Sequence, residues 1–373
     1  MKSGFPGIGM NCLKYRFFIV LAMCLLTRIE SRAGSVISSV PTGVLKRFQF
    51  VEPHMGTEFR IIVYGSEAVF VKRAASKAFS RIAELDNIFS DYRSESELSR
   101  FCRRSGRGPV EISSTLFEAL LKSQKLSERS GGAFDVTISP VVRLWRRARR
   151  RKQLPSESQL EQARRLVNYQ KLRLDSGNRT ASLCHSGMKL DLGGIAKGMA
   201  ADEALRVLDS QGFHHALVAA GGDIVVGDPP PGRKAWEVAI APPDRKSRET
   251  ADRLLLCRAA VSTSGDTEQF VIIDGVRYSH IVDPRTGIGL TRRIQVTVVA
   301  PNGTTSDSLA TAVSVMGPRS GLPLVASFEG TAVRVTVVDD QGVRTIESPR
   351  FREISVQESH LRNCSASSRI LGR

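Results

Sequence analysis

The sequence has 373 residues, of which 41% are hydrophobic and 24% are charged, and these proportions indicate a soluble globular protein with a large core or two lobes. The formal net charge of +17 favours anionic partners such as nucleic acid, anionic lipid or phosphorylated small molecules. The cysteines have neither CxxC nor Cys/His spacing, so the sequence indicates neither a zinc site nor a disulfide framework. We expect isolated buried thiols at Cys102, Cys184, Cys257 and Cys364.

Residues 1–33 have the composition of a secretory signal. Lys14 and Arg16 supply positive charge ahead of the apolar run FFIVLAMCLL (17–26), which at ten residues is too short for a comfortable membrane span. Small residues precede a cleavage position after Ala33. We therefore expect a signal peptide that is removed there, and a mature protein in the periplasm or another extracytoplasmic compartment.

The same segment leaves a membrane anchor open as an alternative, because LAMC ends at Cys24 and is similar to a lipoprotein box. Met23 is larger than the residue usually found before such a cysteine. The Ser/Gly-rich residues 34–47 are expected to form a linker, residues 48–352 the folded domain, and the polar residues 353–373 a tail.

Periodicity within the domain predicts helices and strands without a regular βαβ repeat. Alternation predicts a strand over 57–65, and helical spacing predicts helices over 68–89 and 113–135, the latter capped by Ser113 or Ser114. The further predicted elements are a helical excursion over 140–182, strands over 189–192, 215–227, 236–243, 259–265 and 294–301, helices over 196–211 and 306–317, and hairpins over 269–284 and 332–348. This mixture predicts an α+β fold rather than a doubly wound sheet.

The stretch KLDLGGIAKG (189–198) has features of an anion-binding turn. Gly193 and Gly194 let the backbone approach a ligand closely, the following helix offers free N–H groups, and Lys197 could reach a phosphate. The stretch matches neither the Rossmann pattern nor a Walker loop. Taken alone, it is equally compatible with an ordinary strand-to-helix turn.

Two further positions carry chemistry-bearing side chains. Asp307 and Thr311 are four residues apart on a predicted helix, so their oxygens share one face and suit a hard cation such as Mg²⁺. An aspartate near a helix start is also a common cap. His280 in YSHIVDPRTG (278–287) is either a general base or a structural residue of the predicted strand.

These motifs occur in a fixed order along the chain. The series is HMGT (54–57), SDYR (90–93), GGAFD (131–135), DLGGIAKG (191–198), AGGD (220–223), STSGD (262–266), SHIVDPRTG (279–287) and SDSLATA (306–312). It resembles the FAD:protein FMN transferases, the family often called ApbE, over residues from about 50 to 345.

The resemblance implies an α+β fold of two lobes, built from mixed sheets and helices, with an FAD cleft between the lobes. It implies Mg²⁺-dependent transfer of FMN from FAD to a Ser or Thr hydroxyl of a target protein, with release of AMP. It also implies that FAD is contacted by Met55, Tyr92, Ala133, Phe134, Asp135, Asp191, Lys197, His280 and Ile281. The implied Mg²⁺ ligands are Gly194 (through its backbone oxygen), Asp307 and Thr311, and the implied catalytic residues are His280 and Lys197.

Other functions stay open at this point. An FAD pyrophosphatase that hydrolyses FAD to FMN and AMP would use the same residues, whereas a non-catalytic flavin-binding protein would not need the pair Asp307 and Thr311. The Arg-rich stretch RLWRRARRRK (143–152) supports a nucleic-acid binder by composition only. We expect that stretch to be a solvated helix or a surface insertion whose arginine stems lie on apolar surface, and we expect no nucleic-acid partner.

Overall fold

The structure is a computed structural model that describes residues 44–240, 252–265 and 269–355. The signal peptide expected at 1–33, the lipoprotein box at Cys24 and most of the expected linker and tail lie outside the described residues. All described residues belong to one contact unit, which begins at Thr42.

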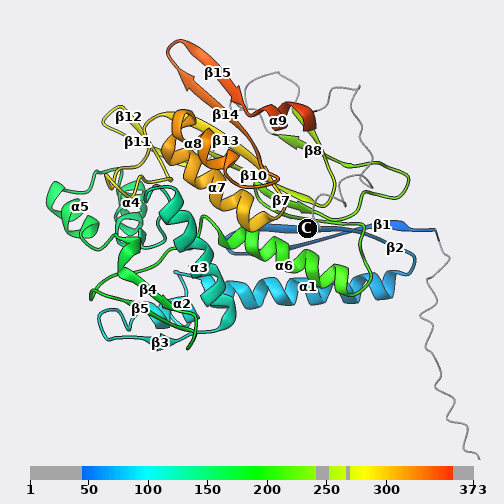
Figure 1. Ribbon diagram of the computed structural model, residues 1–373, viewed down its shortest axis with the longest axis horizontal. Helices are drawn as coiled ribbons and strands as arrows, with labels where there is room; N and C mark the ends of the chain where they lie inside the picture. Colours follow the sequence, from blue (N-terminus) through cyan, green and yellow to red (C-terminus); the bar gives the residue numbers. More distant parts are fainter. Residues whose placement is uncertain (1–43, 241–251, 266–268, 356–373) are drawn as a thin grey trace, which may run out of the picture. The chain divides into compact units, whose positions relative to one another are not determined.

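An antiparallel sheet of eight strands forms the centre of the fold (Figure 1). Its alternating pattern follows from the sequence: in TEFRIIVYG, Phe59, Ile61 and Val63 are fully buried, whereas Glu58 and Arg60 are exposed. In spatial order the strands are β1 (Lys46–His54), β2 (Thr57–Gly65), β6 (Ala216–Ala220), β7 (Asp223–Val226), β10 (Ala259–Gly265), β13 (Arg293–Ala300), β14 (Ala332–Asp339) and β15 (Gly342–Glu347).

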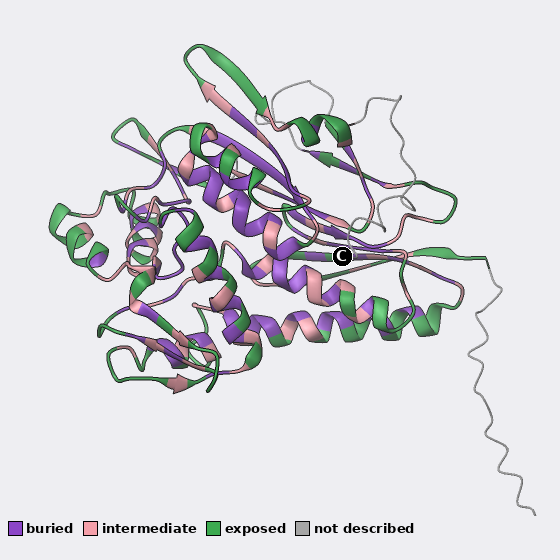
Figure 2. Ribbon diagram, viewed as in Figure 1, coloured by how far each residue is buried: buried purple, intermediate pink, exposed green. Residues whose placement is uncertain are grey.

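Helices cover one face of this sheet. The helices α1 (Ala68–Phe89), α6 (Ala196–Ser210) and α7 (Gly303–Met316) pack in sequence beside one another, and α8 (Pro318–Ala326) follows α7 (Figure 1). Their apolar sides form the main hydrophobic core with the inner face of the strands. Helix α7 is buried along nearly its whole length (Figure 2), because it lies between α6 and the strands β10 and β13.

A second, smaller core lies on the opposite face of the sheet. It is formed by the hairpin β8 (Trp236–Ile240)–β9 (Asp252–Leu256) and by α9 (Pro349–Ile354). Trp236 and Phe351 are its largest side chains, and Leu217 and Val299 of the sheet belong to the same core.

The remaining elements form a helical part beside the sheet (Figure 1). Trp145 packs against Tyr278 and donates a hydrogen bond to the carbonyl of Gly287 (2.8 Å), which fixes the Arg-rich helix to the turn of the DPRTG motif. The elements are α2 (Glu97–Cys102), α3 (Ser114–Arg129), α4 (Ser139–Arg151), α5 (Glu157–Arg164), η1 (Tyr169–Lys171), the small sheet of β3 (Val110–Glu111), β5 (Thr180–Leu183) and β4 (Leu172–Asp175), and the hairpin β11 (Phe270–Ile273)–β12 (Val276–Ser279).

Most predicted elements are confirmed, and so is the α+β class. The helix over 68–89 and the strand over 259–265 have the predicted bounds. Ser113 caps α3 by accepting a hydrogen bond from the backbone N–H of Leu116 (3.1 Å). The Asp-Gly turn at 274–275 joins β11 to β12, and the closing hairpin is β14–β15.

Several expectations about single segments are wrong. Residues 189–192 are not a strand, because pairing is limited to one bridge between Lys189 and Ile138. The segment 215–227 is a hairpin of β6 and β7 rather than one interrupted strand, since Gly221 (φ +63°) turns the chain back. His280 lies after the end of β12, and the excursion over 140–182 ends in the hairpin β4–β5.

The expected ends of the domain also change. Strand β1 begins at Lys46, inside the segment expected to be a linker, and α9 extends to Ile354, inside the expected tail. Periodicity did not predict β1, α2, β9, α8 or α9. Cys102 is buried as expected, but Cys257 is only partly buried and Cys184 is exposed because it follows β5 in a surface turn. Cys364 lies outside the described residues. Among the described residues, no helix is both long and apolar enough to cross a membrane.

Candidate active site

A cavity of about 690 Å³ lies where the helical part meets the large sheet, and its volume is typical of a small-molecule or cofactor site. We call it the reaction cavity. Its walls come from α4, α6 and α7, from the turn between β6 and β7, and from the segments 133–138 and 280–284. The expected site residues that line it are Tyr92, Ala133, Phe134, Asp135, Asp191, Gly194, Lys197, His280, Ile281, Asp307 and Thr311.

Met55 is the expected site residue that the structure does not bring to the reaction cavity. It lies in the turn between β1 and β2 with a φ of +48°, and its side chain packs against the main core. The following Gly56 (φ +74°) completes this turn.

Two glycines bring α6 and α7 into direct backbone contact. A Cβ atom on Gly198 would lie 2.1 Å from the carbonyl oxygen of Gly303, so only a glycine fits there. Asp202 of α6 accepts hydrogen bonds from the backbone N–H groups of Gly303 (2.6 Å) and Thr304 (2.8 Å), which caps the start of α7. The backbone N–H of Gly198 donates to Oδ2 of Asp307 (3.0 Å). These contacts fix Asp307 beside the first turn of α6.

A charged cluster of three side chains results from this packing. The ammonium nitrogen of Lys197 lies 2.8 Å from Oδ2 of Asp223 and 3.5 Å from Oδ1 of Asp307. The side chains of Asp223 and Asp307 are only 5% and 7% exposed, whereas that of Lys197 is 29% exposed. The lysine is therefore the most exposed member of the cluster, although all three side chains line the reaction cavity.

The electrostatics of the cluster follow from burial and proximity. Burial, followed by the nearby carboxylate of Asp223, raises the pKa of Asp307 to about 7, and Lys197 opposes this shift. Burial alone would lower the pKa of the Lys197 ammonium, but Asp223 and then Asp307 outweigh burial and raise that pKa. Lys197 is thus held in its charged form.

Asp223 is the member of the cluster that sequence reasoning missed. The AGGD motif belongs to the series that carries the family resemblance, but the sequence alone indicates no role for its aspartate. Sequence spacing could not place Asp223 near Lys197, because the turn between β6 and β7 brings them together.

The oxygen atoms around Asp307 fit a hard divalent cation. A Cβ atom on Gly194 would lie 3.1 Å from Oγ1 of Thr311, so the backbone at Gly194 and the Thr311 hydroxyl are neighbours. Together with the Asp307 carboxylate they form an all-oxygen donor set, which Mg²⁺ prefers and a soft metal does not. No group of three or more His, Cys, Asp or Glu side chains suited to a metal occurs in the described residues. A cation at Asp307 would therefore rely on neutral oxygens and water for its other ligands.

Asp135 holds the protein chain rather than presenting a free carboxylate. Its Oδ1 accepts from the N–H (2.8 Å) and the hydroxyl (2.7 Å) of Thr137, and its Oδ2 accepts from the N–H of Tyr169 (2.9 Å). Burial raises the pKa of Asp135, and these hydrogen bonds oppose the shift. The buried side chains of Ala133 and Phe134 are thereby fixed in the cavity wall.

Arg146 is a second residue that sequence reasoning missed. Its guanidinium pairs with Asp91 and, at 2.8 Å, with Oδ2 of Asp191, and it lies over the Tyr92 ring at 4.2 Å from the centroid. With its side chain 19% exposed, Arg146 differs from the solvated arginines expected in this stretch. Only the i, i+4, i+7 spacing of the apolar residues Val141, Trp145 and Ala148 could have indicated which arginines face inward.

His280 is oriented by a backbone carbonyl. The backbone N–H of His280 donates to the carbonyl of Gln269 (2.9 Å), and the ring atom Nδ1 lies 3.1 Å from the same oxygen. Because a carbonyl can only accept, this contact favours a proton on Nδ1 of the neutral ring, which leaves the lone pair on Nε2. A histidine in this tautomer can act as a base through Nε2.

The chain is similar in sequence to a family of known proteins. Residues 55–335 match the family described as the ApbE family. A protein of Treponema pallidum named FAD:protein FMN transferase is 30% identical over 335 residues, which span 86% of this chain and 90% of that protein. A protein of the same name from Vibrio cholerae is 31% identical over 304 residues, spanning 80% of this chain and 90% of its own length.

Solved structures share the fold. The flavin transferase ApbE from Vibrio cholerae superimposes with a TM-score of 0.74 at 28% identity, covering 83% of this chain and 99% of that chain. The ApbE protein from Thermotoga maritima gives the same TM-score and identity, covering 84% of this chain and 100% of its own.

Proposed function

The chain belongs to the ApbE family, and from that premise we propose that it transfers FMN from FAD to a Ser or Thr hydroxyl of an acceptor protein and releases AMP. One observation carries the proposal: Lys197, the oxygens of Asp307 and Thr311, and His280 all line a single cavity. A protein that only carried a flavin would need neither the charged cluster nor an oriented histidine.

The transfer step is a displacement at phosphorus. The acceptor hydroxyl oxygen bonds to the phosphorus of the FMN moiety, and the bond from that phosphorus to the bridging oxygen of the pyrophosphate breaks. The bridging oxygen leaves with AMP. The hydroxyl proton passes to Nε2 of His280, whose Nδ1–H is held by the Gln269 carbonyl.

Positive charge must balance the pyrophosphate for this step to occur. We propose that Lys197, which is the most exposed member of the charged cluster, donates to a pyrophosphate oxygen. The carboxylate of Asp307, the hydroxyl of Thr311 and the backbone oxygen of Gly194 would hold Mg²⁺. When bound, Mg²⁺ supplies further neutralisation of charge at the phosphates.

We also propose an extracytoplasmic location, which is supported by the charge and apolar run of residues 1–33. The acceptor would then lie in the same compartment. N-terminal sequencing of the mature protein tests this: a start near Gly34 supports export, retained Met1 on cytoplasmic protein contradicts it, and lipid on Cys24 would establish a membrane anchor.

The test of the transfer reaction is one incubation with FAD, MgCl₂ and a candidate acceptor domain, followed by intact-mass measurement. A mass gain equal to one FMN on the acceptor supports the proposal. Free FMN with unmodified acceptor identifies an FAD pyrophosphatase instead. Asp307→Ala should abolish turnover, whereas Asp340→Ala, which removes an exposed aspartate from the turn between β14 and β15, should not.

A further inference from the structure

Helix α4 has three distinct faces. Val141, Trp145 and Ala148 are buried in a core with the hairpin β11–β12. Arg146 and Arg149 line the reaction cavity. The third face is exposed, and the proposed function leaves it unexplained; it consists of Arg143, Arg147, Arg150 and Arg151.

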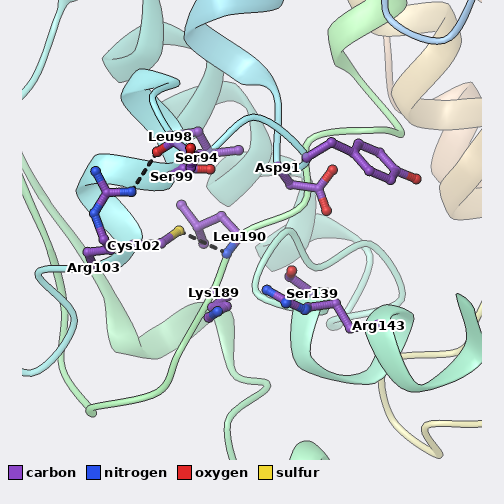
Figure 3. Close-up of a pocket in the computed structure, with 11 residues that line it drawn as sticks. Asp91, Ser94, Leu98, Ser99, Cys102, Arg103, Ser139, Arg143, Lys189 and Leu190 are labelled. Carbon is purple, nitrogen blue, oxygen red and sulfur yellow. Dashed lines mark hydrogen bonds between the residues drawn. The ribbon is translucent and has the colours of Figure 1, made fainter. Parts of the chain in front are cut away.

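A second cavity, of about 310 Å³, lies next to the reaction cavity, and Tyr92 lines both. Figure 3 shows Arg103 and Arg143 on opposite sides of this second cavity, with Lys189 between them. Asp91 is the acidic residue that lines it, and Arg146 already pairs with Asp91. The second cavity therefore has an excess of positive charge.

We use the name basic rim for the exposed face of α4 together with the two cations across the second cavity. Within the described residues, Arg146 is the arginine of α4 that forms ion pairs, and no carboxylate pairs with a member of the rim. The members are Arg103, Arg143, Arg147, Arg150, Arg151 and Lys189.

Stabilisation of the helix explains only part of the rim. Arginines in the last turn of a helix interact favourably with its dipole, which accounts for Arg150 and Arg151. It does not account for Arg143 and Arg147, nor for Arg103 and Lys189 on other elements. On α4, Arg143 and Arg147 are separated by about 6 Å of helix rise at 1.5 Å per residue, and the other arginines of this face are closer in sequence. These spacings are shorter than the Debye length of about 8 Å, so the charges reinforce one another.

We propose that the basic rim docks an acidic surface of the acceptor protein beside the reacting hydroxyl. This inference rests on the proposed function, because that function requires a macromolecule to approach the reaction cavity. The rim adjoins the cavity through Tyr92 and through α4, whose inner arginines line it. Charge of this kind raises the rate of productive encounter and orients the partner. Anionic lipid or nucleic acid would not require the rim to adjoin the reaction cavity.

A matched pair of charge reversals tests the inference. The double variant Arg143→Glu/Arg147→Glu changes the rim, and Lys72→Glu/Arg73→Glu makes the same change in net charge on the exposed face of α1. None of the four residues lines the reaction cavity. Binding of fluorescein-labelled poly-L-glutamate is measured by fluorescence anisotropy at low ionic strength with FAD present. FAD affinity is measured in parallel by flavin fluorescence.

The rim variant should bind the acidic polypeptide at least about tenfold more weakly than the wild type, which is within the range expected for electrostatic steering. The α1 variant should bind the polypeptide within about twofold of wild type, and both variants should bind FAD within about twofold of wild type. In the transfer assay the rim variant should show a raised KM for the acceptor and an unchanged kcat. Equal weakening in both variants, or no weakening in the rim variant, would overturn the inference.

Two further outcomes separate the alternatives. If phosphatidylglycerol vesicles or a single-stranded oligonucleotide bind through the rim and poly-L-glutamate does not, the rim serves a different partner and the inference fails. If wild-type protein transfers no FMN to any acceptor, the proposed function fails, and the polypeptide-binding comparison still decides the chemistry of the rim. If the rim variant transfers FMN with an unchanged acceptor KM, only the inference fails.

Discussion

The ammonium of Lys197 in the first turn of α6 lies 2.8 Å from the carboxylate of Asp223, the first residue of β7. Asp307 lies 3.5 Å from the same ammonium. With both carboxylates ionised, one lysine and two aspartates carry a net charge of −1. This charge attracts a divalent cation and repels a pyrophosphate, so we expect FAD to bind more tightly when Mg²⁺ is present.

Asp223→Asn tests this reading of the cluster. The asparagine keeps a hydrogen-bond acceptor for Lys197 but removes one negative charge. At an effective dielectric constant of 20, unit charges about 6 Å apart interact by roughly 3 kcal/mol, so the Mg²⁺ concentration for half-maximal turnover should rise by about tenfold or more. FAD binding in EDTA should not weaken. A Mg²⁺ titration that superimposes on that of the wild type would contradict the assignment.

Sequence reasoning succeeded where a local pattern determines the structure. The helix over 68–89 and the Asp-Gly hairpin at 274–275 depend on periodicity and turn chemistry alone, and both are present. The segment 189–192 alternates like a strand, but strand pairing needs a partner, and the neighbouring chain at Ile138 offers only one bridge. Local sequence carries no information on that partner.

Part of the site could be predicted from the resemblance to family motifs rather than from local patterns. Motif resemblance led to Lys197, His280, Asp307 and Thr311, all of which line the reaction cavity. It did not lead to Asp223 or Arg146, because their roles depend on contacts between segments that are distant in the sequence. Asp223, beside the turn between β6 and β7, pairs with Lys197 of α6, and Arg146 of α4 pairs with Asp191. Met55 shows the converse, since a matching motif did not bring its side chain to the cavity.

Cys102 provides a prediction about pH. Burial raises the pKa of its thiol to about 11. The thiol of an unfolded chain would lose its proton near pH 9, whereas the thiol of the folded chain would keep it. The contribution of the thiol to folding stability is therefore fully present below about pH 9 and is lost as the pH rises from about 9 to about 11. Two pKa units correspond to about 3 kcal/mol.

The free energy of unfolding by urea is measured from about pH 8 to about pH 11, which includes the interval over which the contribution of the thiol is lost. Stability of the wild type should fall more steeply than that of Cys102→Ala. Cys184→Ala removes an exposed thiol and should follow the wild-type slope. Parallel curves for wild type and Cys102→Ala would show that burial does not perturb Cys102.

His280→Ala should fold and bind FAD, but transfer FMN slowly. A general base contributes roughly 10²–10⁴-fold to a rate, and Nε2 of His280 is the proton acceptor in the proposed step. The decisive quantity is the single-turnover rate of FMN transfer at saturating FAD. His185→Ala, which changes an exposed histidine in a surface turn, serves as the control. A His280→Ala rate within about threefold of wild type would remove this residue from the mechanism.

Gly198→Ala should destabilise the protein and also disturb the metal site. In an unconstrained helix interior this change would stabilise by about 1 kcal/mol, because alanine is the better helix former. Here the new Cβ would lie 2.1 Å from the carbonyl oxygen of Gly303 and 2.8 Å from Cβ of Asp307, so α6 and α7 must separate. Such overpacking typically costs about 1–3 kcal/mol. Urea unfolding should therefore show a loss of stability, opposite in sign to the effect of helix propensity.

Because Asp307 must move with α7, the Mg²⁺ requirement of the folded fraction of Gly198→Ala should rise as well. Ser210→Ala, at the exposed end of the same helix, should leave both quantities near their wild-type values. A stabilised Gly198→Ala with a normal Mg²⁺ requirement would show that the contact between the two helices does not position Asp307.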